Sequence, residues 1–257
     1  MNAFACAVAP ALRYSVENNV MQLPRLGAAR EFFGKACVLV VFSLFATLKA
    51  RAIKSQLETW DPSRGAEQYI DIASHLAAFI FLVLVLTLTL LRYKPKETAQ
   101  GWEPRVSALL GTFLSLSLVA LPIADLGYAM RIVAIAFVLI GTLLSIYALA
   151  WLGQSFSIYA QARQLVTAGP YAIVRHPLYV CEQIAMIGIV LLCLSPWAIA
   201  IATVQWMFQL RRMTNEERVL MATFPEYAAY AAKTPRIIPR LFRSRNTKPA
   251  DRFLSAG

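Results

Sequence analysis

The residues best suited to chemistry are concentrated in two stretches of this sequence. The first is GPYAIVRHPLYVCEQ (169–183), which places an arginine, a histidine, two prolines and a glutamate directly before and inside a long apolar run. The second is RRMTNEE (211–217), which follows another apolar run and carries two adjacent arginines and two adjacent glutamates. Polar groups beside hydrocarbon are energetically costly, so their presence at the edges of apolar segments points to a functional site.

The spacing of these residues predicts two facing helices. Pro177 suits the first turn of a helix, and it pushes His176 towards an extended conformation that aims its side chain away from the helix axis. One face of this helix carries Tyr179, Glu182, Gln183 and Met186, and one face of the next helix carries Gln205, Gln209, Arg212 and Glu216. The short SPW connection (195–197) favours a hairpin that brings both stripes together. We expect a semi-polar cavity near the cytoplasmic surface, roofed by the Gly-Pro turn at 169–170 and by the segment around Tyr227 and Tyr230.

A purely structural interpretation competes with this one. Polar residues at helix ends often lie in the headgroup region, and Arg212 with Glu216 forms an ordinary i,i+4 ion pair. Two facing stripes combined with a proline-bounded His176 favour a site over that alternative. His75, alone in an apolar segment, is interpreted as structural.

Composition places the chain in a membrane. Of its 257 residues 58% are hydrophobic and 15% are charged, with a mean hydropathy of +0.56, which leaves too little polar surface for a soluble fold. The net charge of +11 is attributed to cytoplasmic loops and anionic lipid rather than to nucleic acid, because no nucleic-acid recognition motif is present. Four cysteines without a CxxC pair, together with two distant histidines, predict neither a disulfide framework nor a metal site.

The element that must position the site is a bundle of transmembrane helices. We predict an all-α integral membrane protein with about six spans, at 32–48, 69–91, 106–123, 130–152, 178–194 and 198–210. The distribution of Lys and Arg among the loops places both termini in the cytoplasm, although Lys49, Arg51 and Lys54 fall on the opposite side. A single membrane domain (1–257) would comprise N-terminal helices (32–153), a cofactor-binding and catalytic portion (154–239) and a basic cytoplasmic tail (240–257).

A family resemblance rests on the same residues. The stretch LVTAGPYAIVRHPLYVCE followed by RRMTNEERVLMATFPEYAAYAAKTPRIIP resembles the carboxy-terminal half of the isoprenylcysteine carboxyl methyltransferase family, which is related to the phospholipid N-methyltransferases. The resemblance covers 154–239 and depends on RHPxY, a helical hairpin, a Glu-Glu pair and a Tyr-xx-Tyr segment. Many relatives have glycine where this chain has Cys181, and the larger side chain narrows that wall of the expected pocket.

The resemblance implies transfer of a methyl group from S-adenosylmethionine at a membrane-embedded site open to the cytosol. It implies that the cofactor lies between the 169–179 segment and the Glu-Glu pair, in contact with Gly169, Pro170, Tyr171, Arg175, His176, Tyr179, Glu216 and Glu217. Carboxylates and aromatic faces can both stabilise the positive charge of its sulfonium group.

The methyl acceptor is expected to be lipophilic and to enter from the bilayer. An isoprenoid or prenylated carboxylate would need only a cationic anchor, for which Arg212 or Arg211 is the candidate. A phospholipid amine would instead need a base, such as Glu182, His176 or a tyrosine. The further alternatives are an NADPH-dependent membrane sterol-type reductase, against which the Glu-Glu pair argues, and a relative of the family without turnover.

Overall fold

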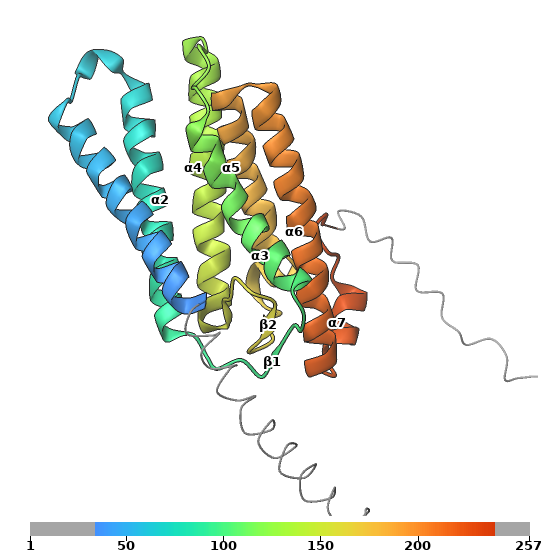
Figure 1. Ribbon diagram of the computed structural model, residues 1–257. Helices are drawn as coiled ribbons and strands as arrows, with labels where there is room; N and C mark the ends of the chain where they lie inside the picture. Colours follow the sequence, from blue (N-terminus) through green and yellow to red (C-terminus); the bar gives the residue numbers. More distant parts are fainter. Residues whose placement is uncertain (1–33, 240–257) are drawn as a thin grey trace, which may run out of the picture.

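Long helices standing side by side form most of the molecule, as the computed structural model of residues 34–239 shows (Figure 1). The α-helices are Gly34–Glu58, α2 (Ala66–Leu91), α3 (Glu103–Phe113), α4 (Tyr128–Leu152), α5 (Pro177–Cys193), α6 (Pro196–Thr223) and α7 (Tyr227–Lys233). Short 3-10 helices are η1 (Pro62–Arg64), η2 (Leu114–Ala120), η3 (Gly153–Ser155) and η4 (Gly169–Ala172). The predicted basic tail, both termini and the first two residues of the first predicted span lie outside the described residues.

Three helices in the described part are long and apolar enough to cross a membrane, namely Gly34–Glu58, Ala66–Leu91 and Tyr128–Ser155. They correspond to the first, second and fourth predicted spans, and the protein is a membrane protein. The apolar helix α5 has 17 residues, whereas α6 extends unbroken past its apolar part to Thr223. The polar stripe from Gln205 to Glu216 predicted this continuous helix.

The third predicted span differs from a single α-helix. Its α-helical part, α3, ends at Phe113, and the chain continues as η2 to Ala120. The serines of this LSLS stretch explain the change, because Ser115 Oγ donates to the carbonyl of Thr112 (3.4 Å) and Ser117 Oγ donates to that of Leu114 (2.7 Å). Such local bonds compete with the regular helical ladder and favour the tighter 3-10 winding.

A proline and a capping serine set the first residues of the two helices next to the site. Pro177 is the first residue of α5, as expected, and His176 precedes it with φ −126° and ψ 58°. Ser195 caps α6, its Oγ accepting from the backbone N–H of Ala198 at 3.1 Å, a cap that typically contributes about 1 kcal/mol. The short connection between α5 and α6 therefore makes the predicted hairpin.

Helix α5 packs directly on α4 through small residues. A Cβ placed on Gly141 would lie 2.3 Å from the backbone nitrogen of Ala185, and one on Gly188 would lie 2.5 Å from the carbonyl oxygen of Ala134. Small residues of this kind let two membrane helices approach at backbone distance, where van der Waals packing replaces the hydrophobic effect as the source of stability. This contact fixes α5 and leaves its polar face directed towards α6.

A two-residue β-ladder modifies the all-α prediction. Strands β1 (Glu97–Thr98) and β2 (Gln161–Ala162) pair antiparallel, with Glu97 opposite Ala162 and Thr98 opposite Gln161. The ladder joins the α2–α3 connection to the α4–α5 connection, at the same end of the bundle as α7 (Figure 1). The loops that border the site are therefore tied together by main-chain hydrogen bonds.

Candidate functional site

A pocket opens at the end of the bundle where the β-ladder and α7 lie. Its walls come from the end of α4, the 155–166 loop, η4, the first turn of α5, the middle of α6 and the start of α7. The predicted site residues that line it are Tyr171, Arg175, His176, Tyr179, Arg212 and Glu216. The structure thus gathers six of the predicted residues around one cavity.

The Gly-Pro turn supports this pocket from behind. Gly169 has φ +59°, and a Cβ there would lie 2.4 Å from Trp151 Cδ2, so both the backbone conformation and the close packing require glycine. Pro170 follows as the second residue of η4, which carries the buried Tyr171 into the pocket wall. Neither Gly169 nor Pro170 lines the cavity, and both act through the placement of Tyr171.

His176 joins the α5 start to α6. Its ring Nε2 lies 2.9 Å from Glu217 Oε1, and the ring stacks on Tyr179 with centroids 5.6 Å apart and planes 20° apart. His176 is buried, with 6% of its surface exposed. The ring is therefore held from both sides at the edge of the pocket.

Glu217 does not line the pocket and instead forms an ion cluster beside it. Its Oε1 lies 3.3 Å from Arg175 Nη2 and 3.3 Å from Arg236 Nε. Burial alone would raise the pKa of Glu217, but the hydrogen bond with His176 and the neighbouring His176, Arg236 and Arg175 side chains hold that pKa below its usual value. The backbone N–H groups of Arg175 and His176 also donate to the carbonyls of Pro235 and Arg236 (2.8 and 3.1 Å). We call this contact, made by Glu217, Arg175, His176, Pro235 and Arg236, the Glu217 clasp.

Glu216 faces the opposite way, into the pocket. It accepts a short hydrogen bond from the Tyr179 hydroxyl and another from Arg212 Nε at 3.1 Å. The Arg212 guanidinium also lies over the Tyr179 ring, 5.0 Å from its centroid. A carboxylate, a cation and an aromatic face therefore share one wall.

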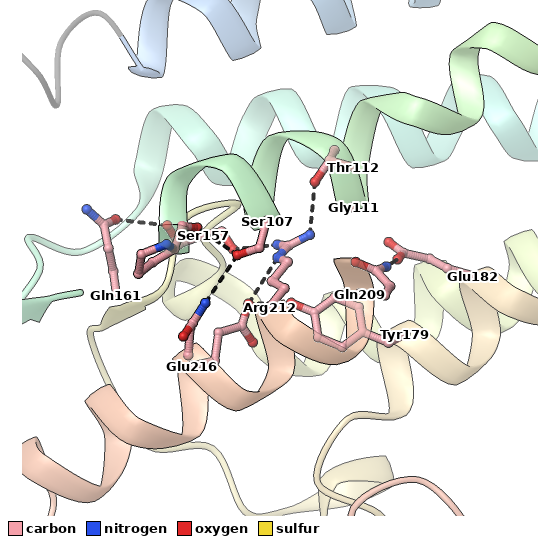
Figure 2. A network of polar contacts seen from close by, with 12 residues as sticks. Ser107, Gly111, Thr112, Ser157, Gln161, Tyr179, Glu182, Gln209, Arg212 and Glu216 are labelled. Atoms are coloured by element: carbon pink, nitrogen blue, oxygen red, sulfur yellow. Dashed lines mark hydrogen bonds and ion pairs between the residues drawn. The ribbon is translucent and has the colours of Figure 1, made fainter. Parts of the chain in front are cut away.

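Arg212 is fixed by three segments of the chain, as Figure 2 shows. Besides Glu216, it donates from Nη1 to Thr112 Oγ1 (2.9 Å) and from Nη2 to the carbonyl of Ser157 (3.1 Å). Only 4% of its surface is exposed. A guanidinium has five N–H donors, so these contacts leave part of its donor capacity for a ligand.

The two predicted stripes do face each other. Gln209 Nε2 donates to Glu182 Oε2 (2.8 Å), and Gln183 Nε2 donates to Gln205 Oε1 (3.1 Å). Gln205 also donates to the carbonyl of Gly111 in α3 (2.8 Å). The stripes form a polar seam between α5 and α6, and Figure 2 shows its pair Gln209 and Glu182 beside Tyr179 and Arg212.

The other predicted site residues lie away from the cavity wall. Glu182 belongs to the polar seam rather than to the pocket lining. Arg211 is exposed, one residue away from the inward-facing Arg212. Cys181, expected to narrow the pocket, is not among its lining residues. Glu182 and Arg211 therefore stay predictions that the pocket geometry does not support directly.

Several contacts around the candidate site are not predicted from the sequence. Thr112 and Ser157 hold Arg212, and Arg236 completes the Glu217 clasp. Asn215 donates to Glu103 Oε2 (2.9 Å) and to Ser107 Oγ (3.2 Å), which joins α6 to α3. Asn215 and Arg212 are three residues apart on the helix, and that spacing is the one sequence signal for a second polar face.

Some buried donors of the pocket wall have no hydrogen-bond partner among residues 34–239. They are the hydroxyl groups of Tyr171 and Tyr227 and the Nε of Arg175. Buried polar groups are nearly always paired with protein groups, ordered water or a ligand, so donors of this kind are available to a polar molecule that enters the pocket. Together with Glu216 and the aromatic rings, they fit a cofactor with a flat base, several polar groups and a cationic centre.

Comparison with known proteins identifies the segment that carries these residues. Residues 133–222 match the family model described as the isoprenylcysteine carboxyl methyltransferase (ICMT) family. This part of the chain is similar to that family. The matched segment contains α5, nearly all of α6 and, among the predicted residues, everything from Gly169 to Glu217.

Individual relatives carry two kinds of name. The chain is 35% identical over 112 residues to protein-S-isoprenylcysteine O-methyltransferase B of Arabidopsis thaliana, covering 41% of this chain and 57% of that protein. It is 39% identical over 113 residues to protein-S-isoprenylcysteine O-methyltransferase of Schizosaccharomyces pombe, covering 41% and 48%. It is also 36% identical over 89 residues to a cobalt-zinc-cadmium resistance protein of Cupriavidus metallidurans, covering 33% and 41%. The chain thus spans about half the length of the relatives it matches.

The name of the resistance protein concerns metal ions, which proteins hold with clusters of ligating side chains. Within the part of the chain that the structure describes, no group of three or more His, Cys, Asp or Glu side chains is placed to hold a metal ion. The Glu216 carboxylate of the pocket is instead paired with Arg212.

Proposed function

We propose that the protein is an integral membrane methyltransferase that uses S-adenosylmethionine and methylates a carboxylate on a lipophilic acceptor, such as an isoprenoid or a prenylated molecule. The observation that carries this proposal is the pocket itself. Within a segment of the ICMT family, it combines aromatic rings, the Glu216 carboxylate and buried donors without partners.

The pocket residues suit the charge of this cofactor. S-adenosylmethionine, when bound, supplies a methyl group activated by a positively charged sulfur. Glu216 and the face of Tyr179 can stabilise a cation, and Arg212 holds both of them in place. The residues would act mainly by positioning the reactants and excluding water, which can contribute about 7–11 kcal/mol to catalysis.

A carboxylate acceptor places few further demands on the protein. It is already ionised at neutral pH, so no base is required, and a fixed cation suffices to orient it. Arg212 supports this role better than Arg211 because it is buried at the pocket wall and retains N–H donors. Arg211 is exposed outside the wall.

The polar seam favours one alternative, a phospholipid N-methyltransferase. An ammonium group must lose a proton before it can accept a methyl group, and the Glu182 carboxylate, bonded to Gln209 beside the pocket, is a candidate base. Lipid extracts from cells that overproduce the protein distinguish the two functions. The appearance of methylated ethanolamine lipids would support the alternative, and their absence would reject it.

The direct test of the main proposal is cofactor binding followed by product analysis. Purified protein in nanodiscs is expected to bind radiolabelled S-adenosylmethionine saturably, and replacement of His176 or Glu217 by alanine is expected to weaken binding. Incubation with deuterated-methyl cofactor and isoprenoid extracts, followed by mass spectrometry, then identifies the methylated carboxylate. Saturable binding that neither replacement changes would remove the site assignment, and no binding at all would remove the proposed function.

A further inference from the structure

A second cavity opens at the same end of the molecule as the candidate site, on a different side of α6. Its volume is about 480 Å³. One wall is the connection from β1 to the start of α3 (97–104), and the other is formed by the α6 residues Asn215, Arg218, Val219 and Ala222. In the described part of the chain, the two cavities share no lining residue. We call this cavity the α3–α6 groove, and its first wall precedes the segment that matches the family.

A buried asparagine fixes two opposite charges at the α3–α6 groove. Only 3% of the surface of Asn215 is exposed. Its Nδ2 donates to Glu103 Oε2 (2.9 Å) and to Ser107 Oγ (3.2 Å), and its Oδ1 accepts from Arg218 Nη1 (3.4 Å). Glu103 and Arg218 both line the groove. A carboxylate and a guanidinium are therefore held on either side of one carboxamide.

The charged groups of the groove keep capacity for a ligand. The bonds with Asn215 use one oxygen of Glu103 and one N–H of Arg218, whereas a carboxylate has two oxygens and a guanidinium has five N–H donors. Glu97 adds an exposed second carboxylate to the lining. Trp102 is 75% exposed, and the face of an indole ring attracts cations. The groove thus combines a part suited to a cation with one guanidinium suited to an anion.

The groove lies at the level of the lipid headgroups. Helix α6 stands beside the helices that can cross the membrane (Figure 1), and its apolar part ends at Leu210, five residues before Asn215. With a rise of about 1.5 Å per residue, Asn215 lies about 7–8 Å beyond that point. The headgroup layer is about 5–8 Å thick on each side of a bilayer. Trp102 precedes the Glu103 that Asn215 contacts, and tryptophan is enriched at membrane interfaces.

We propose that the α3–α6 groove binds the headgroup of a zwitterionic phospholipid. Its ammonium group would lie against Glu103, Glu97 and Trp102, and its phosphate would accept hydrogen bonds from Arg218. An anionic lipid offers the phosphate without the ammonium, and the two carboxylates of the groove disfavour it. The inference does not depend on the proposed function, because no residue of the groove lines the candidate site in the described part of the chain.

The test measures binding of two lipids with identical short acyl chains to the full-length protein in detergent, by native mass spectrometry. Dihexanoyl phosphatidylethanolamine carries a phosphate and an ammonium, whereas dihexanoyl phosphatidylglycerol carries a phosphate and a neutral glycerol. Glu103→Gln removes the negative charge but keeps an oxygen that can accept from Asn215. It is expected to weaken phosphatidylethanolamine binding by on the order of 10-fold and to leave phosphatidylglycerol binding unchanged. Arg218→Gln is expected to weaken binding of both lipids by a similar factor.

Two exposed residues at the same end of the molecule provide matched controls. Glu226→Gln and Lys233→Gln make the same changes of charge outside the groove, so both dissociation constants are expected to stay the same. Trp102→Ala removes an exposed side chain and is expected to weaken phosphatidylethanolamine binding without lowering the melting temperature. It tests the groove even where Glu103→Gln lowers stability. Glycerophosphoethanolamine, the soluble headgroup, is expected to bind more weakly than the lipid because it lacks the acyl chains.

The pattern across lipids and variants decides the proposal. Weaker phosphatidylethanolamine binding in Glu103→Gln and Trp102→Ala, with phosphatidylglycerol binding unchanged, supports it. Equal weakening of both lipids by Glu103→Gln, or changes no larger than those in the two controls, overturns it. Tighter binding of phosphatidylglycerol than of phosphatidylethanolamine to the unaltered protein also overturns it, since the groove would then recognise phosphate alone. Equal binding of glycerophosphoethanolamine and the lipid overturns the assignment to a lipid.

Discussion

Replacement of Glu217 by alanine should release the segment after α7 from the start of α5. In the Glu217 clasp, one carboxylate meets His176 at 2.9 Å and two arginines at 3.3 Å each. The backbone N–H groups of Arg175 and His176 are bonded to the carbonyls of Pro235 and Arg236. Without the carboxylate, Arg175 and Arg236 would face each other with no counter-charge between them, and these backbone bonds should open more often.

The expected size of this effect follows from the contacts. A hydrogen bond to a charged group contributes about 2 kcal/mol, and each partly exposed ion pair contributes roughly 0.5 kcal/mol. The Glu217 and Arg236 side chains are 20% and 32% exposed, so solvent screens the pairs in part. The sum is about 3 kcal/mol, which corresponds to an increase of roughly 100-fold in the opening equilibrium.

Amide hydrogen exchange measures this opening directly. In the variant, peptides containing the amides of Arg175 and His176 should exchange about 100-fold faster, whereas peptides from the middle of α4 should exchange as before. Glu226→Gln provides the control, because Glu226 is an exposed carboxylate at the same end of the molecule. Unchanged exchange at 175–176 in Glu217→Ala would refute the reasoning, and so would equal acceleration in the Glu226 control.

Three further predictions concern the same region. Gly169→Ala should lower stability by about 1–3 kcal/mol because of its left-handed backbone and its contact with Trp151; a thermal melt should show this loss partly relieved when Trp151 is also replaced by alanine. Arg212→Lys should lower both the melting temperature and cofactor affinity more than Thr112→Val does, because an ammonium cannot reproduce the planar fork that holds three partners. The pKa of Glu217 is lower in the folded protein than its usual value, so the clasp should contribute fully above about pH 4.3 and be lost as the pH falls through the lower folded value. The difference in melting temperature between the protein and Glu217→Gln should accordingly stay constant from pH 7 to pH 5 and shrink below that, and a difference that grows with acidity would contradict the assignment.

The helical architecture of the site follows largely from sequence periodicity. Pro177 sets the start of α5, and the four-three-four spacing from Gln205 to Glu216 requires a continuous α6. Because the connection between α5 and α6 is short, the two polar stripes are expected to face each other. The hydrogen bond between Gln209 and Glu182 confirms this. Local rules suffice for these features because each depends on residues close together in the chain.

Local rules do not predict which of the two adjacent glutamates, Glu216 or Glu217, faces the pocket. Adjacent residues on a helix point about 100° apart, so one of the two must leave the pocket, and the sequence does not indicate which. The partners decide it, since Tyr179 meets Glu216 and His176 meets Glu217. The two-residue β-ladder is likewise too short to leave an alternating pattern in the sequence.

The contact between Arg212 and Thr112 limits how this protein can be recombined with its relatives. The region shared with the family begins at residue 133, yet the guanidinium at its centre is held by a hydroxyl 100 positions earlier in the chain, on α3. Consider a chimera that takes residues up to 132 from another protein and the rest from this chain. It would keep Arg212 but would lose Thr112, unless the other protein has a hydroxyl at that position. We expect such an exchange to keep Arg212 in place only when the donor supplies a hydroxyl at the position facing it, because the contacts of this arginine extend back to α3, before the first residue of the family match.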